Sequence, residues 1–322
     1  MNMNQNTLHE PNLIIEIESF TKTTIEQGLQ RKDLPRLIKL LDDFERIYSC
    51  NHSYSDYLGL FDFITEFEFQ NFKKFKDGIY SYESLLRVSD QLLGYFSWQF
   101  QVHKPKVDSD LRQYKHRVKR RLDRLKKHAE DLFNRFSRNL VVRVDLKYRA
   151  DSQDRVDIEI FNKHVRTLRN RMANKDKCFR NLKFNAWCLE HAPEGSYHVH
   201  LFLIYDGSAC NYDCKLARWV GRTWVNEITE GLGYYWNCHT CKHADEDLEG
   251  DGSNMTNTLN TQEEKNYKYL NGLGMIRRED PIGLERLQAV YSYLARITAE
   301  KIEQRLRVRV KGMRAFGCSI TT

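Results

Sequence analysis

Two histidines separated by a single residue, His198 and His200, are the residues whose types and spacing most directly suggest chemistry. They lie in the segment 196–204, whose bulky apolar residues predict a β-strand. Side chains alternate between the two faces of a strand, so both imidazoles should point to the same side. They could hold one divalent cation, or they could be an ordinary pair of core or surface histidines without a ligand.

A metal held by two imidazoles usually takes a carboxylate or amide as its third protein ligand and leaves positions open for substrate. Glu190 lies near the end of the preceding predicted strand, and a hairpin turn at 192–195 would bring it back beside the histidines. Taken alone, it would be an exposed residue at a strand end. His191 faces the opposite side of that strand and is the weaker candidate.

If a metal site of this kind supports a displacement reaction, a nucleophile is also needed, and the helix predicted over residues 281–305 contains two tyrosines that could attack a phosphodiester. Tyr291 falls on the apolar stripe of this helix and is predicted to pack in the core. Tyr293 lies roughly 100° from the centre of that stripe, on the same side as Arg296. A cation on the scissile phosphate would polarise it enough for a phenol to attack. The alternative is a boundary tyrosine in a chain that has 17 of them.

The composition is that of a soluble globular protein whose charge favours an anionic partner, although many basic proteins bind none. The chain has 322 residues, of which 41% are hydrophobic and 30% charged, which is enough for two domains. A net charge of +7 favours nucleic acid as the partner. No run approaches the ~18 apolar residues of a membrane span, and residues 1–12 do not resemble a secretory signal. Together with eight scattered cysteines, this predicts a cytoplasmic protein without a membrane partner.

The clearest predicted helix covers residues 111–136, where apolar residues recur every three or four positions. Its opposite face carries charges almost entirely of one sign. Such a face is either simply solvated or in contact with a phosphate backbone. The candidate DNA-binding residues are Lys115, Arg117, Lys119, Arg120, Arg121 and Arg124.

The chain divides into a helical and a mixed part. Residues 1–105 are predicted to form a helical N-terminal domain of unknown role, because 13–100 has helical spacing and no β-type alternation. Residues 106–322 are predicted to form an α+β domain around an antiparallel sheet. Its predicted strands are 140–146, 182–189, 197–204 and a short one at 306–311, with further helices at 161–178 and 212–231.

A polar insertion is predicted at about 237–266. It contains Cys238 and Cys241, which could supply half of a zinc site that His239 or His243 would complete. Because no second cysteine pair stands out, a flexible loop is the preferred interpretation.

The segment His198-Val199-His200 with its apolar flanks resembles the metal motif of HUH endonucleases, which is histidine, hydrophobe, histidine. Other signals occur in the order found in inovirus-type (filamentous phage) replication initiators and their prophage-borne relatives, the YagK/YfjJ group. These signals are Arg143-x-Asp145-Leu146, Trp187, Glu190, the histidine strand, Ser292 to Arg296, and the tail Arg314-x-Phe316-Gly317-x-Ser319. The resemblance covers about residues 110–320.

This resemblance implies an HUH nuclease domain with an RRM- or ferredoxin-like core and the activity of a rolling-circle replication initiator. Tyr293 would attack single-stranded DNA, leaving a 5′-phosphotyrosine and a free 3′-hydroxyl that primes synthesis. Mg²⁺ or Mn²⁺ would be held by His198, His200 and Glu190. The family usually has lysine three residues after the tyrosine; Arg296 keeps the charge but not the ammonium geometry.

The implied partners are single-stranded and origin DNA, with a separate host helicase and polymerase, because the chain has no phosphate-binding glycine loop of a motor. The competing interpretation is a DNA-binding regulator with a vestigial nuclease site. A relaxase usually carries a third histidine near the pair and a tyrosine close to the N-terminus, and this chain has neither arrangement. A transposase of HUH type is the remaining alternative.

Overall fold

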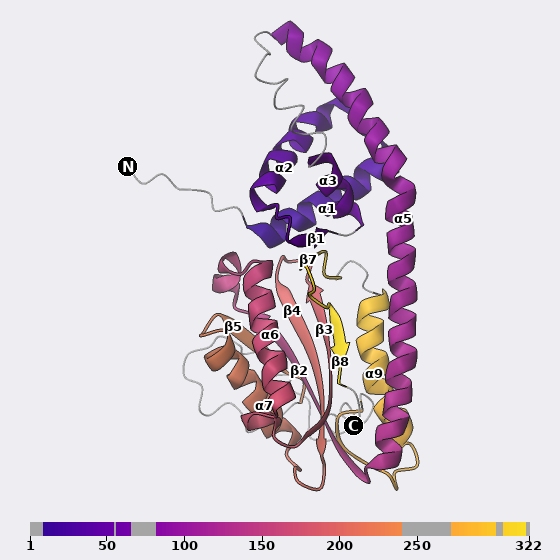
Figure 1. Cartoon of the computed structure of the whole chain (residues 1–322), viewed down its shortest axis with the longest axis vertical. Coiled ribbons are helices and arrows are strands. Elements are labelled where there is room, and N and C mark those ends of the chain that lie inside the picture. The colour runs from indigo at the N-terminus through magenta and orange to yellow at the C-terminus, as the bar shows by residue number, and fades with distance from the viewer. Residues whose placement is uncertain (1–8, 55, 66–81, 240–271, 301–304, 320–322) are drawn as a thin grey trace, which may run out of the picture.

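In a computed structural model the chain is an α+β protein, in which helices cover an antiparallel sheet and a helical region precedes it (Figure 1). The structure describes residues 9–54, 56–65, 82–239, 272–300 and 305–319, with only the backbone described at 82–89 and 292–300. The predicted α+β class and helical N-terminal region are therefore confirmed.

The main sheet of the described residues has six strands in the order β5-β2-β4-β3-β8, with β6 also pairing with β2. All of these pairs are antiparallel. Of the four predicted strands, those at 140–146, 182–189 and 197–204 are confirmed in this sheet and are longer than predicted. The strand predicted at 306–311 is present but shorter, and it lies outside this sheet. The strands are β2 (Arg138–Tyr148), β3 (Leu182–His191), β4 (Tyr197–Asp206), β5 (Gly233–Asn237), β6 (Gly274–Arg277) and β8 (Phe316–Cys318).

The predicted hairpin between β3 and β4 is present. Its turn is closed by a hydrogen bond from the Ala192 N–H to the Ser196 carbonyl at 2.8 Å. Gly195 adopts a φ of +85°, which glycine reaches without the steric cost of a Cβ. The resulting register places Glu190 opposite His198. The sequence spacing between the two residues is therefore a spatial neighbourhood in the folded chain.

Two layers of helices enclose the sheet (Figure 1). Helices α6 (Ile158–Asn174) and α7 (Asp213–Thr223) cover one face, and α5 (Tyr82–Arg135) and α9 (Gly283–Glu300) cover the other. The odd-numbered residues of β4, such as Leu201, join the core under α6, because alternate side chains point to opposite faces. The even-numbered Phe202 and Ile204 join a second core with α5 and α9.

Several helices differ in extent from their predictions. The helix predicted at 161–178 begins three residues earlier and ends at Asn174, where Lys175 turns into the left-handed region at φ +57°. The helix predicted at 212–231 ends at Thr223 and continues as a wider π-type turn. Within the described residues, no helix has the length and apolar character needed to cross a membrane.

The N-terminal region consists of α1 (Glu10–Gln27), α2 (Leu34–Ile47), α3 (Tyr57–Phe63) and the beginning of α5. A short strand that was not predicted, β1 (His52–Tyr54), pairs with β7 (Val308–Val310) near the end of the chain. Buried residues of α1 and α2 belong to the same apolar core as Leu201 of the sheet. The predicted boundary at 105/106 falls inside the continuous helix α5, and it stays a prediction.

Buried ion pairs also join the N-terminal region to the end of the chain. Arg305 contacts Glu18 at 2.6 Å and Asp56 at 2.5 Å. Arg307 pairs with Glu18 and donates a hydrogen bond to the carbonyl of His191 at 3.1 Å. These contacts hold the helical region against the end of the sheet where β3 turns into β4.

Candidate functional site

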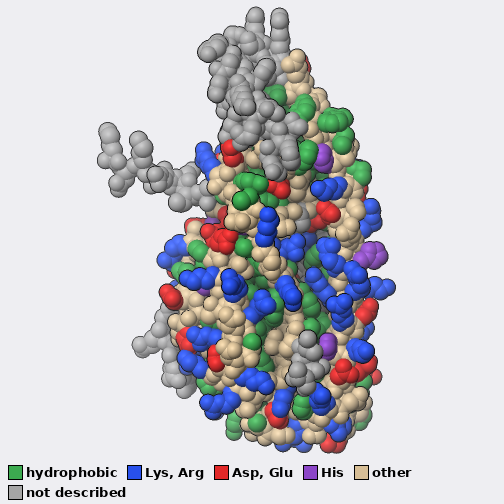
Figure 2. All heavy atoms as spheres, in the orientation of Figure 1, with side chains coloured by type: hydrophobic (Ala, Val, Ile, Leu, Met, Phe, Trp, Pro, Cys, Tyr) green, Lys and Arg blue, Asp and Glu red, His purple; other side chains and the backbone are tan. Residues whose placement is uncertain are grey.

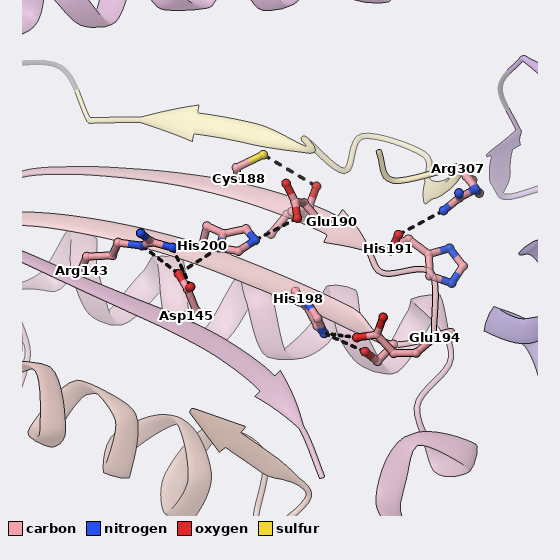
Figure 3. Close-up of polar contacts among 11 residues, drawn as sticks. Arg143, Asp145, Cys188, Glu190, His191, Glu194, His198, His200 and Arg307 are labelled. Carbon is pink, nitrogen blue, oxygen red and sulfur yellow. Dashed lines mark hydrogen bonds and ion pairs between the residues drawn. The ribbon is translucent and has the colours of Figure 1, made fainter. Parts of the chain in front are cut away.

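His200 lies at the centre of a hydrogen-bonded group that spans three neighbouring strands (Figure 3). Its Nδ1 is 2.9 Å from Asp145 Oδ1 on β2, and its Nε2 is 2.9 Å from Glu190 Oε2 on β3. The strand register brings this about, since Asp145 is paired directly with His200. All three side chains are buried, on the face of the sheet that α5 and α9 cover.

Burial by itself would lower the pKa of His200, but the charge of Asp145 and the hydrogen bonds to both carboxylates raise it to about 9. Both ring nitrogens therefore carry protons near neutral pH and donate to the two carboxylates. Burial opposes ionisation of Asp145, yet His200 and Arg143 together hold its pKa well below the usual value. Arg143 donates to both carboxylate oxygens of Asp145, at 3.2 and 2.8 Å.

His198 shares this face of β4 but has a different environment. Its Nε2 is 2.7 Å from Ser196 Oγ and 3.7 Å from Glu194 Oε1. Burial, followed by the charge of Lys147, lowers the pKa of His198 to about 3. The ring is therefore neutral at physiological pH, which is the form that binds a metal ion.

The donor set fits a divalent cation in part. Ligands about 2.1 Å from an octahedral ion lie about 3.0 Å apart in adjacent positions, which matches the separation of His200 Nε2 from Glu190 Oε2. A cation would replace the proton on that nitrogen. The third predicted ligand, His198, is turned towards Ser196. Accordingly, in the part of the chain that the structure describes, no three His, Cys, Asp or Glu side chains already converge on one point.

Helix α9 carries both candidate tyrosines over the same face of the sheet. The Tyr291 ring is fully buried against Phe184, with ring centroids 5.7 Å apart, which confirms the predicted core position. Tyr293 and Arg296 lie two and five residues further along α9; their backbone is helical, and their side chains are outside the described residues. Beyond the helix, Arg305 forms a β-bridge with Glu190, so α9 leads from Phe184 towards the Glu190 end of β3.

The six predicted DNA-binding residues all lie on α5, which runs along this face (Figure 1). Five of them are exposed, and Arg121 is half-buried with its guanidinium 5.1 Å from the Phe316 ring. Figure 2 shows Lys and Arg side chains gathered over the middle of α5 and beside β7 and β8. The basic surface is therefore on the same side of the molecule as the histidine face.

The second predicted metal candidate begins at the last described residues before the insertion. The ring nitrogens of His239 are both used: Nδ1 is 2.8 Å from Asp213 Oδ2, and Nε2 accepts the backbone N–H of Arg143 at 3.0 Å. Cys238 is buried, and Cys241 and His243 lie outside the described residues. In this arrangement, His239 serves to hold β2 and has no lone pair left for zinc.

Asp145 and Arg143 are the site residues whose roles the sequence did not reveal. Their alternate spacing on a predicted strand placed both on one face, which was the available signal. Nothing local to residue 145 shows that β2 lies beside β4 with Asp145 opposite His200. His191, by contrast, faces away from the site as predicted, and its ring contacts Tyr197 at 4.8 Å between centroids.

Comparison with known proteins identifies one family. Residues 105–272 match the family described as the YagK/YfjJ C-terminal domain, which covers more than half of the chain. No curated protein and no solved structure matches significantly.

Proposed function

We propose that this chain, which belongs to the YagK/YfjJ family, is a metal-dependent HUH-type endonuclease that initiates rolling-circle replication by nicking single-stranded DNA. The observation that carries the proposal is the meeting of His200 and Glu190 at 2.9 Å. It occurs on the sheet face along which the tyrosine-bearing helix α9 runs. The exposed basic face of α5 on the same side supplies the surface for a phosphate backbone.

In this proposal, Glu190, His200 and His198 hold Mg²⁺ or Mn²⁺, which when bound polarises the scissile phosphate and offsets its charge. The phenol oxygen of Tyr293 attacks the phosphorus and loses its proton to solvent. The phosphorus–O3′ bond breaks, and the departing O3′ takes up a proton from solvent to become a 3′-hydroxyl. Asp145 accepts a hydrogen bond from the Nδ1–H group of His200. This fixes the ring so that its Nε2 atom faces Glu190 and would be the nitrogen that binds the cation. Arg296 supplies positive charge on the same helix.

A DNA-binding regulator is the second candidate function, and one observation favours it. Asp145, His200 and Glu190 already satisfy one another without a cation, as the members of a purely structural charge network would. Such a protein would use the basic face of α5 to bind DNA and would leave the phosphodiester intact. Cleavage is therefore the property that separates the two functions.

The test uses single-stranded oligonucleotides that tile the replicon encoding the chain, incubated with Mg²⁺ or Mn²⁺ and analysed on denaturing gels. A 3′-label should become covalently attached to the protein, while a 5′-label should leave on a fragment that a polymerase can extend. Tyr293→Phe should reduce adduct formation at least about 1000-fold, because it removes the nucleophile. His200→Ala should abolish cleavage and retain most of the DNA binding.

Tyr291→Phe is the matched control, since it makes the same chemical change two residues away. The Tyr291 hydroxyl is buried with no hydrogen-bond partner among the described residues, so its loss should neither unfold the protein nor stop adduct formation. An adduct in Tyr293→Phe would refute the assigned nucleophile. Oligonucleotide binding without any adduct in the wild type would favour the regulator instead.

A further inference from the structure

A small cleft lies between α5, the end of β3 and the segment that leads into β7. Tyr114, Arg117 and Arg121 line it from α5, where their spacing places them on one side of the helix across successive turns. Arg309 lines it from β7, and Cys188 forms part of it from β3. The cleft therefore joins residues that are nearly two hundred positions apart in the sequence.

The cleft concentrates positive charge that the protein neutralises only in part. Within the described residues, Arg117, Arg121 and Arg309 form no salt bridge; a fourth arginine in the wall, Arg305, is paired with Glu18 and Asp56. The carboxylate of Asp56 also lines the cleft and acts on Arg309 at longer range. Burial lowers the pKa of both Arg121 and Arg309, and the positive charge of Arg117 lowers the pKa of each further. The three guanidinium groups are thus close enough to repel one another, which an anion in the cleft would reverse.

The carboxylate in the wall, Asp56, is already paired with Arg305, and the neighbouring Tyr114 is a potential donor to an anion. Tyr114 is neutral, since burial raises the pKa of its phenol, and it can donate a hydrogen bond. Cys188 lies two residues before Glu190 on the same strand face, so the cleft adjoins the candidate cation site.

We propose that Arg117, Arg121 and Arg309 form a built pocket for one backbone phosphate of single-stranded DNA, next to the phosphate that is cleaved. The assignment of DNA as the ligand rests on the proposed nuclease function. The pocket would fix the register of the strand on the protein, because guanidinium groups bind phosphate with directional pairs of hydrogen bonds. The other basic residues of α5 between Lys104 and Arg135 are exposed and lie outside the cleft, so they would attract DNA without positioning a particular phosphate.

The test measures binding of a fluorescent single-stranded oligonucleotide by anisotropy, in EDTA, over a range of salt concentrations. Arg309→Gln should weaken binding about tenfold at low salt and reduce the salt slope by about 0.7, the value for one phosphate contact. Arg117→Gln/Arg309→Gln should reduce the slope no further, because both side chains hold the same phosphate. Arg112→Gln is the matched control: it removes an exposed charge from α5 outside the cleft and should change affinity less than twofold.

Thermal melting checks that each variant is folded. If Arg309→Gln does not fold, the same measurement is made with Arg117→Gln, because Arg117 is exposed on a helix and its replacement should not unfold the protein. Equal effects of Arg309→Gln and Arg112→Gln would overturn the pocket, and additive slopes would overturn the single shared phosphate. Competition by inorganic phosphate with no DNA binding would overturn DNA as the ligand. This assay does not depend on cleavage, so the two proposals can fail separately. If the wild type forms no adduct but the pocket variants still lose DNA binding, the proposed nuclease function is refuted and the phosphate pocket is supported.

Discussion

Strand β4 directs its odd-numbered side chains towards α6 and its even-numbered side chains towards α5 and α9, and polar groups are buried differently on the two sides. On the even-numbered side, Asp145, His200 and Glu190 are charged and paired with one another. On the odd-numbered side, the imidazoles of His164 and His191 are buried without charge, and the buried charge of Arg307, paired with Glu18, lies at the edge. Burying a charge is costly unless it is paired or removed by a pKa shift, and the sheet uses one solution on each face.

The neutral groups of the odd-numbered side include two histidines and a carboxyl group. The Tyr148 hydroxyl and His164 Nδ1 are 2.9 Å apart, and burial lowers the pKa of that imidazole. Burial, with the charge of Arg307, holds the pKa of His191 well below its usual value. Burial raises the pKa of Glu10, which contacts Tyr197, to about 7. The two sides of the sheet therefore differ in how their buried polar groups are stabilised: by ion pairing around His200 and by loss of charge at His164 and His191.

The largest expected effect comes from breaking the charge pairing. Asp145→Asn should lower the free energy of unfolding by about 3–5 kcal/mol, because Arg143 and His200 would both lose a buried countercharge. Urea unfolding measures it. Asp206→Asn is the control, since Asp206 makes a partly exposed pair with Lys183 at 3.3 Å and should cost less than about 1 kcal/mol. Equal losses in the two variants would show that pairing does not hold the charged face together.

How much of this the sequence could predict depends on how local each feature is. The alternation in β2, β3 and β4, and the turn at Gly195, were readable because strand and turn preferences act over a few residues. They were enough to place Glu190 beside His198. The core position of Tyr291 followed in the same way from helical spacing.

The features that the sequence could not predict depend on contacts between distant residues. The pairing of β1 with β7 joins His52 to Val310, and no pattern in a three-residue strand specifies such a partner. Arg309 reaches the cleft on α5 through that pairing. The roles of Asp145 and Arg309 therefore depend on topology, whereas the histidine pair is visible in nine consecutive residues.

A second prediction concerns the neutral face and its dependence on pH. Glu10 accepts a hydrogen bond from the Ile158 N–H and one from the Tyr197 hydroxyl, and burial raises its pKa from 4.5 to about 7. Between pH 4.5 and about pH 7, Glu10 is therefore protonated in the folded state and ionised in the unfolded state. The contribution of Glu10 to stability is lost as the pH rises through this window, by up to about 3 kcal/mol.

Glu10→Gln should remove this loss, because the uncharged amide can accept the Ile158 N–H through its oxygen and donate to the Tyr197 hydroxyl oxygen through its NH2 group. The variant should match the wild type near pH 4.5 and exceed its free energy of unfolding at pH 8 by up to about 3 kcal/mol. Urea unfolding at a series of pH values measures the difference. A constant difference across the series would mean that folding does not raise the pKa of Glu10, and the contrast between the two faces would fail at this position.

The smallest expected effect tests whether the pKa of Glu10 depends on its neighbours as well as on burial. Asp157 caps α6 by accepting the Ile160 N–H at 2.8 Å, and its negative charge raises the pKa of Glu10 after the effect of burial. Asp157→Asn keeps a good cap and removes that charge, at the cost of a weaker interaction with the helix dipole. We compare the free energy of unfolding of the variant with that of the wild type at two pH values. The difference should be about 0.5 kcal/mol more in favour of the variant at pH 8 than at pH 5, because Glu10 is ionised only at pH 8.

The same substitution in a Glu10→Gln background isolates the interaction, since the residue at position 10 then has no charge to repel. The difference between pH 8 and pH 5 should disappear there, while the small loss from the helix dipole should remain at both values. If the difference persists without Glu10, Asp157 acts through Glu159 or another group of α6. Burial alone would then account for the neutral carboxyl, as it accounts for the neutral imidazole of His164 on the same face.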